Sequence, residues 1–254
     1  MLYIDLGNDP NAQAELDKLI ADFNDHPKLP ETVIEIGLKY YSKAHYSEAD
    51  GNDERAAQYY LKAIAVWERV LAEFPPSASY TPWAYYISAV VYSQELRRYA
   101  EGIACYSAVV DNWPNYEYAW HAQYFIGKYY EKLRDAGGIS AEEANPLIEQ
   151  AYQAVVENYP DSRSAPRALL ILAGSALRTA QWSQAAAYLE QFLDKYPDNP
   201  RVPDVLYDLA RAYEQMGQLE PASNVYQRFM DMANPNDPRV ETVQAKLNEL
   251  EGRN

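Results

Sequence analysis

The chain has 254 residues, of which 48% are hydrophobic, and a formal net charge of −15 at pH 7. The acidic excess disfavours binding to nucleic acid and to anionic membrane surfaces, because both depend mainly on Lys and Arg. The longest apolar run, around residues 168–173, is too short to span a bilayer, and residues 1–30 lack the basic and apolar regions of a signal peptide. We therefore expect a soluble chain with no membrane span.

An aromatic residue followed by proline recurs four times along the chain. The aromatic members are Phe74, Trp113, Tyr159 and Tyr196, at successive spacings of 39, 46 and 37 residues. Proline interrupts a helix because it lacks the backbone N–H that the helical hydrogen bond requires. Recurrence at 20 to 50 residues is typical of stacked supersecondary units, so the pattern predicts an array of helical hairpins.

The predicted elements form a single array over residues 1–254. A first helix over 12–23 resembles the second half of a hairpin, which makes it either an N-terminal cap or, as we favour, the remnant of a longer protein. Five hairpins follow at about 30–74, 79–113, 116–159, 163–196 and 200–233. A polar helix over 238–250 is expected to cap the array and keep it soluble.

The last two hairpins repeat at 37 residues without a gap. Ala210 and Ala222 lie 12 residues apart, as do their counterparts 37 positions earlier. Small residues at this spacing indicate the place where the two helices of a hairpin approach closely. Gly217 marks the turn of the last hairpin, and Ala180 holds the equivalent position in the one before it.

The first and third hairpins are longer than the others. We expect their extra residues to form inserted turns at 42–53 and 131–139, between the two helices of each hairpin. In the third hairpin, Ser140 and Glu143 have the spacing of a capping box. Pro146 is then expected to kink or restart the helix that follows. In the first, we expect a solvated turn that caps the helix after Asp53.

The hairpin pattern resembles the tetratricopeptide repeat. Its first helix has a small residue and then an aromatic three positions on, as in Ala210 and Tyr213, and its second helix has Ala222 and Tyr226. The closing YPDS and YPDN, at 159–162 and 196–199, are similar to a bacterial subgroup that includes outer-membrane assembly lipoproteins and Tol-Pal coordinators. The resemblance covers about residues 30–235. It implies an all-α, right-handed superhelix of about five hairpins, although the inserted turns depart from the family pattern.

In this family the first helix of each hairpin lines the concave face, so the resemblance implies where a partner binds. The outward positions of those helices carry an apolar and aromatic series flanked by basic residues. The candidate partner-binding residues are Ile34, Tyr41, Trp83, Tyr86, His121, Tyr124, Lys128, Arg167, Arg178, Tyr207 and Arg211.

Two interpretations of this set stay open. Tyrosine rings with Lys and Arg suit an extended or helical peptide that carries carboxylates, because Arg binds carboxylate through two hydrogen bonds. Alternatively, the rings pack on each other and the basic residues pair with Glu131 and Glu214. The chain has 24 tyrosines, and adjacent pairs such as Tyr40-Tyr41 cannot both be buried. The exposed apolar surface would suit a homodimer or a docking face.

No catalytic motif is present in the sequence. His26, His45 and His121 lack the spacing of metal ligands, and no phosphate-binding loop or nucleophile elbow occurs. Residues 50–54 are acidic but lack the ligand positions of an EF-hand. Cys105 is the only cysteine, which excludes an internal disulfide and favours a packing role. We predict no enzymatic activity, no metal and no cofactor.

Together these features predict a non-catalytic scaffold or adaptor that binds a peptide or partner protein. The resemblance favours a periplasmic or envelope location over the cytoplasm, within a multiprotein assembly. The alternatives are a cytoplasmic docking scaffold and a regulatory or substrate-presenting subunit of an enzyme complex.

Overall fold

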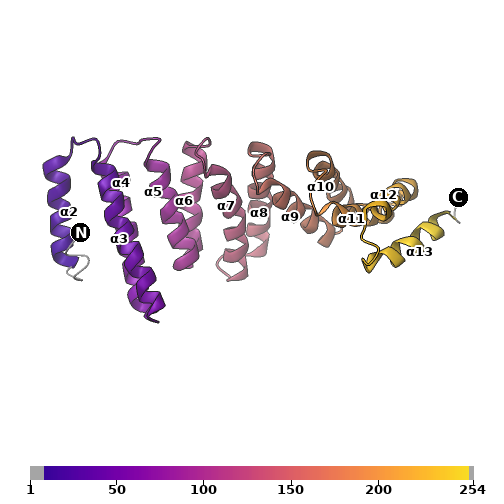
Figure 1. The fold of residues 1–254 in the computed structure, drawn as a ribbon, viewed down its shortest axis with the longest axis horizontal. Helices are drawn as coiled ribbons and strands as arrows, with labels where there is room; N and C mark the ends of the chain where they lie inside the picture. The colour runs from indigo at the N-terminus through magenta and orange to yellow at the C-terminus, as the bar shows by residue number, and fades with distance from the viewer. Residues whose placement is uncertain (1–8, 252–254) are drawn as a thin grey trace. The chain divides into compact units, whose positions relative to one another are not determined.

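The computed structural model describes residues 9–251 of the chain. These residues form twelve α-helices and one short π-helix, with no strand among them, which confirms the predicted all-α fold (Figure 1). None of these helices is long and apolar enough to cross a bilayer. The chain divides into two compact units, one up to Ile148 and one from Glu149, and each is described separately below.

The first unit contains helices that pack on their neighbours in chain order. α3 lies along α4, and α4, α5 and α6 each contact the next helix (Figure 1). Helix α8 begins in this unit and ends in the second. The bounds are α2 (Asp9–Phe23), α3 (Leu29–Ala49), α4 (Asp53–Glu73), α5 (Thr81–Val90), η1 (Val91–Glu95), α6 (Tyr99–Asn112), α7 (Ala119–Asp135) and α8 (Ala141–Asn158).

The second unit is also a succession of packed helix pairs. Each of α9 to α12 contacts the helix that follows it. The bounds are α9 (Ala165–Arg178), α10 (Trp182–Lys195), α11 (Val202–Gln215), α12 (Leu219–Met232) and α13 (Arg239–Glu251).

The small residues of the repeat lie in the cores of the helix pairs. Ala210 and Ala222 have no exposed surface, and Ala173 and Ala185 are at most 1% exposed. A small residue at such a position leaves room for the facing helix to approach closely. The predicted burial of all four alanines is confirmed.

The extra residues of the first hairpin are helical rather than a loop. α3 continues to Ala49 and α4 begins at Asp53, so the connection is only residues 50–52. Tyr40 and Ala44 on α3 stay buried along this extension, as do Ala56 and Tyr60 on α4. Because buried residues continue at helical spacing, both helices lengthen and pack on each other. The predicted inserted turn at 42–53 is therefore wrong.

The connection in the third hairpin is likewise shorter than predicted. α7 extends to Asp135, so the turn comprises residues 136–140 instead of 131–139. The capping box is confirmed, since the Ser140 hydroxyl accepts from the Glu143 backbone N–H at 3.2 Å, and Glu143 Oε2 accepts from the Ser140 N–H at 3.3 Å. Helix α8 continues through Pro146 without restarting. In the first hairpin, Asn52 rather than Asp53 caps α4, through its side-chain oxygen.

A left-handed residue follows the first helix of every hairpin. These residues, with their φ angles, are Gly51 (73°), Arg97 (53°), Gly137 (75°), Ala180 (56°) and Gly217 (72°). A positive φ reverses the chain tightly after a helix, which allows the next helix to pack back against it.

Candidate partner-binding faces

Three of the predicted partner-binding residues gather around the buried indole of Trp67 in α4. Its Nε1 donates a hydrogen bond to the carbonyl of Ile34 at 3.3 Å. The ring centroid of Tyr41 lies 6.3 Å from that of Trp67, and the ring of Trp83 stands perpendicular to it at 5.8 Å. Ile34, Tyr41 and Trp83 are each partly buried. We call these three residues the Trp67 face.

Gly37 explains how Trp67 reaches this position. A Cβ atom at residue 37 would lie 2.6 Å from Cδ1 of the Trp67 indole, closer than carbon atoms can approach. The absence of a side chain on α3 therefore lets the indole lie directly against the helix backbone. In this position the indole contacts both Ile34 and Tyr41.

A second cluster lies between α5 and α7. The hydroxyl of Tyr86 is 2.6 Å from Nδ1 of His121. The Tyr86 ring stacks on Tyr118 at 5.3 Å and meets the fully buried Tyr106 edge-on at 5.8 Å. Tyr118 is 41% exposed. We call Tyr86, Tyr118 and His121 the Tyr86 face.

The electrostatics of the Tyr86 face favour a neutral hydrogen-bonded pair. Burial raises the pKa of Tyr86 to about 12, so its hydroxyl stays protonated at neutral pH. Burial, with a smaller effect from the charge of Lys128, lowers the pKa of His121. The Tyr86 hydroxyl then donates a hydrogen bond to Nδ1 of a neutral imidazole. The ammonium of Lys128 lies over the Phe125 ring at 4.7 Å, beside this pair.

Tyr124 is placed differently from the other rings of the series. Its side chain is only 6% exposed, and its ring stands perpendicular to that of Phe125 at 5.8 Å. Little of its surface is left for a partner, so we do not include Tyr124 in the faces defined above.

In the second unit, Tyr207 and Arg211 lie together on α11. The Arg211 guanidinium is 5.7 Å from the Tyr207 ring and pairs with Asp208 at 3.7 Å. A second guanidinium, that of Arg239 from α13, lies 5.3 Å from the same ring. Burial raises the pKa of Asp208, which the nearby Arg211 partly offsets. We call Tyr207, Arg211 and Arg239 the Tyr207 face.

The other predicted cations are arranged in different ways. Arg167 and Arg178 are both exposed, at opposite ends of α9, about 16 Å apart along the helix axis. Glu214 does not pair with Arg211, because it accepts hydrogen bonds from Lys246 at 3.0 Å and Tyr226 at 2.5 Å.

Sequence reasoning missed Tyr118 and Arg239 as members of these faces, and it missed Trp67 as the buried ring on which the Trp67 face packs. Tyr118 precedes α7, Trp67 lies on a second helix, and Arg239 opens the terminal helix. Each is brought to its face by contact between elements, so no local spacing pointed to it. For Tyr118 and Arg239 the sequence signal was an aromatic or basic residue at the start of a helix.

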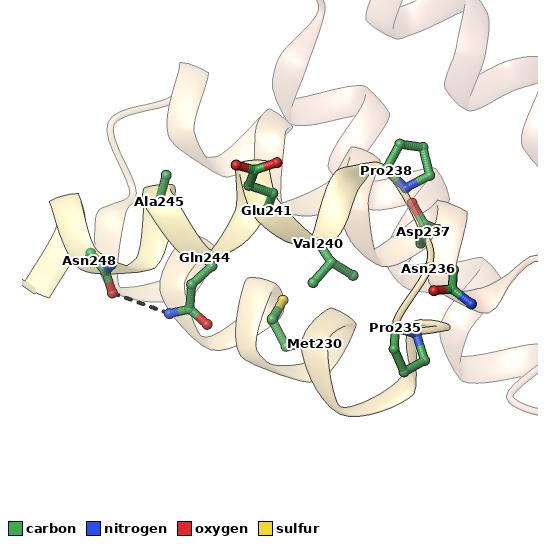
Figure 2. Close-up of a pocket in the computed structure, with 10 residues that line it drawn as sticks. All are labelled: Met230, Pro235, Asn236, Asp237, Pro238, Val240, Glu241, Gln244, Ala245 and Asn248. Atoms are coloured by element: carbon green, nitrogen blue, oxygen red, sulfur yellow. Dashed lines mark hydrogen bonds between the residues drawn. The ribbon is translucent and has the colours of Figure 1, made fainter.

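The second unit also contains an open groove of about 600 Å³ between α12 and α13 (Figure 2). Met230 of α12 lies across from Val240 and Gln244 of α13. Apolar side chains line it together with the amides of Asn236, Gln244 and Asn248 and the carboxylates of Asp237 and Glu241. In the part of the chain that the structure describes, no group of three His, Cys, Asp or Glu residues is arranged to hold a metal ion.

Comparisons with known proteins agree on the type of fold. Two family models, both described as tetratricopeptide repeat, match residues 149–200 and 181–247, and neither is an enzyme family. BtubC from P. vanneervenii is 13% identical with a TM-score of 0.51, over 91% of this chain and 93% of that one. At this identity the likeness shows the fold alone.

Two further solved structures are similar to the chain at lower TM-scores. PilW, a type IV pilus biogenesis factor, is 17% identical with a TM-score of 0.46, over 96% of this chain and 94% of that one. YrrB, a repeat protein with an unusual peptide-binding site, is 16% identical with a TM-score of 0.48, over 91% and 97%. A comparison with curated proteins gave no match.

Proposed function

Because the chain is a tetratricopeptide-repeat protein, and such repeats generally serve as scaffolds for protein–protein interaction, we propose that it binds a segment of a partner protein on the Trp67 and Tyr86 faces. The binding is non-catalytic and serves a multiprotein assembly of the bacterial envelope. The YPDS and YPDN endings of its hairpins support the envelope context.

The observation that carries this proposal is that partly exposed aromatic rings pack against fully buried ones. Tyr86 rests on Tyr106, and Tyr41 and Trp83 rest on Trp67, while the Tyr86 hydroxyl is held by His121. Rings fixed in this way lose little conformational entropy when a partner covers them. They therefore supply contact area of the kind that dominates binding energy at protein interfaces.

The second unit offers a partner basic side chains, in addition to the aromatic rings of the first unit. The Arg211 side chain is 57% exposed, and its pairing with Asp208 at 3.7 Å is loose. A partner carboxylate therefore has access to the guanidinium, which binds carboxylates through two parallel hydrogen bonds. Arg167 and Arg178 offer similar contacts on α9. We propose that the part of the partner bound by this unit is acidic.

The test compares two exposed tyrosines. Crosslinked partners are recovered from fractionated host cells that express the wild type, Tyr118→Ala or the matched control Tyr46→Ala, since Tyr46 is 73% exposed and lies outside all three faces. We expect recovery to fall at least about fivefold for Tyr118→Ala alone, because ring truncation at an interface centre removes 1 kcal/mol or more.

Equal recovery with both variants would contradict the assignment of the Tyr86 face. The fraction that contains the partner tests the envelope context. A catalytic chain recovered from the cytoplasmic fraction would favour an enzyme-associated subunit instead.

A further inference from the structure

Five aromatic rings of the first unit form a continuous row that includes the Tyr86 face. Tyr116 contacts Tyr118 with ring centroids 5.7 Å apart, and Tyr118 stacks on Tyr86 at 5.3 Å. Tyr86 meets His121 at 5.7 Å, and His121 meets Trp120 edge-on at 5.4 Å. We call these five residues the aromatic row.

The aromatic row is assembled from three places in the chain and lies at the surface of the first unit. Tyr86 comes from α5, Tyr116 and Tyr118 from the connection between α6 and α7, and Trp120 and His121 from the first turn of α7. Tyr118 is 41% exposed, and the other four residues are partly exposed. Each residue of the row therefore keeps part of its surface for a partner.

The row presents hydrogen-bond donors that have no acceptor within the described part of the chain. Nδ1 of His121 accepts from the Tyr86 hydroxyl, so the proton of the neutral imidazole is on Nε2. Nε2 of His121 and Nε1 of Trp120 can therefore only donate, and neither forms a hydrogen bond within residues 9–251. Neither nitrogen is among the buried polar atoms that lack a partner, so solvent reaches both.

The five side chains of the row are uncharged at neutral pH. Tyrosine and tryptophan carry no charge there, and the lowered pKa of His121 keeps its imidazole neutral. Two charges of opposite sign act on the ends of the row. Glu117 raises the pKa of Tyr116, after the larger effect of burial, and Lys128 lowers that of His121, also after burial. The row therefore favours an occupant with no net charge of its own.

Aromatic faces combined with unused donors match one class of protein segment. Proline has a carbonyl that accepts a hydrogen bond and no N–H, so aromatic faces can cover it without leaving a donor of the segment unpaired. A proline-rich segment is also preformed as a polyproline II helix, which docks on aromatic grooves with little loss of entropy. An α-helix uses its carbonyls internally, and its backbone would leave Trp120 and His121 without acceptors.

We infer that the aromatic row binds a proline-rich segment of the partner protein in the polyproline II conformation. The inference rests on the proposed function and names the class of segment that the Tyr86 face takes. Such a helix rises about 3.1 Å per residue, so about every second residue meets the next ring of the row. The proline rings pack on the tyrosines, while the indole and imidazole N–H groups donate to carbonyls of the segment.

The experiment titrates the ¹⁵N-labelled protein with blocked octaproline and follows its backbone amide shifts by NMR. The matched probe is a blocked peptide of the same length made of alternating glycine and serine, which is uncharged but flexible. We expect saturable shifts at residues 116–122 and around Tyr86 with octaproline only.

Two variants test the rings and the donors of the row separately. Tyr118→Ala removes a ring and should weaken octaproline binding at least about fivefold. Trp120→Phe keeps a ring but removes the N–H, and should weaken binding about threefold. The control Tyr46→Ala changes a residue that is 73% exposed and lies outside the row, so it should bind like the wild type. Melting curves should show that all three variants fold.

Equal shifts with the two peptides, or unchanged octaproline binding in Tyr118→Ala, would overturn the inference. A helical peptide of alanine, leucine and glutamine that binds the row more tightly than octaproline would overturn it in favour of a helical segment. Because no native partner is used, the result is independent of the crosslinking test. Loss of the native partner in Tyr118→Ala, without octaproline binding to the wild type, would support the Tyr86 face and reject a proline-rich segment.

Discussion

Ala180 and Gly217 adopt the same left-handed backbone conformation 37 residues apart, with φ angles of 56° and 72°. Ala180 follows α9 and Gly217 follows α11, each at the turn inside a hairpin. A left-handed conformation costs an alanine about 1 kcal/mol, because its Cβ approaches the following carbonyl oxygen, whereas glycine has no Cβ. The fold thus imposes strain on one hairpin that the next one avoids.

Replacing Ala180 by glycine and Gly217 by alanine should change the free energy of unfolding in opposite directions. We expect Ala180→Gly to raise the free energy of unfolding by about 0.5 to 1 kcal/mol and Gly217→Ala to lower it by about 1 kcal/mol. Urea denaturation followed by circular dichroism measures both. A loss of stability in Ala180→Gly would mean that the turn is not strained by its side chain.

The close approach of the Trp67 indole to Gly37 predicts that a methyl group added at residue 37 lowers the stability of the protein. Gly37→Ala should lower the free energy of unfolding by about 1 to 3 kcal/mol, because the indole must move away from α3. The matched control is Gly174→Ala on α9, where the nearest atom is the tip of Arg178 at 3.5 Å. That substitution should stabilise the protein by about 0.5 to 1 kcal/mol through helix propensity. Similar effects of both changes would contradict the close approach.

The lowered pKa of His121 predicts a dependence of stability on pH. Between the pKa of the folded protein and the unfolded value near 6.5, the unfolded chain binds a proton that the folded chain does not. Stability is therefore expected to fall as the pH decreases below about 6.5. The loss of stability with falling pH should be smaller in the variant His121→Gln, which keeps a hydrogen-bond acceptor for Tyr86. An NMR titration of His121 with a midpoint above 6.5 would exclude this explanation.

Arg239 connects α13 to α11 through several contacts. Its guanidinium pairs with Asp237 at 2.6 Å and Asp204 at 2.8 Å, and it lies over Phe229 at 5.3 Å. The hydrogen bonds from Arg239 lower the pKa of Asp237 to about 2. Because that pKa is depressed, the stabilisation is present above about pH 4 and disappears as the pH falls toward 2.

Removal of this side chain should loosen the terminal helix. We expect Arg239→Ala to speed amide hydrogen exchange in α13 about tenfold and to move the Asp237 titration up toward about 4. The control is Arg201→Ala, whose pair with Asp204 is more exposed and does not involve α13. Unchanged exchange in Arg239→Ala would show that the apolar contacts of α13 are sufficient.

Short-range patterns predicted the helices and their cores well. Ala210 and Ala222 are buried where the 37-residue repeat placed them, and Ser140 and Glu143 form the expected capping box. The same reasoning failed where the repeat was irregular. It interpreted the extra residues before Asp53 as a turn, because a comparison of repeat lengths does not distinguish a longer loop from two longer helices.

The residues that form the faces could be predicted only in part from the sequence. Tyr86 and His121 were both among the expected residues, but their hydrogen bond depends on the packing of α5 against its neighbours. Tyr124 shares the helix position of Tyr86 and yet is almost fully buried. A helix position fixes the direction of a side chain, whereas its exposure depends on the size of the residues around it.

The sequence by itself determined the all-α class, the positions of the buried small residues and the capping box of Ser140 and Glu143, because these depend on residues within one or two helical turns. Only the tertiary structure decided that Trp67 packs against Ile34, Tyr41 and Trp83, and that the hydroxyl of Tyr86 meets the ring of His121. Such contacts join residues from different helices. Their geometry depends on how closely the helices approach, and that distance is set by the packing of many side chains at once.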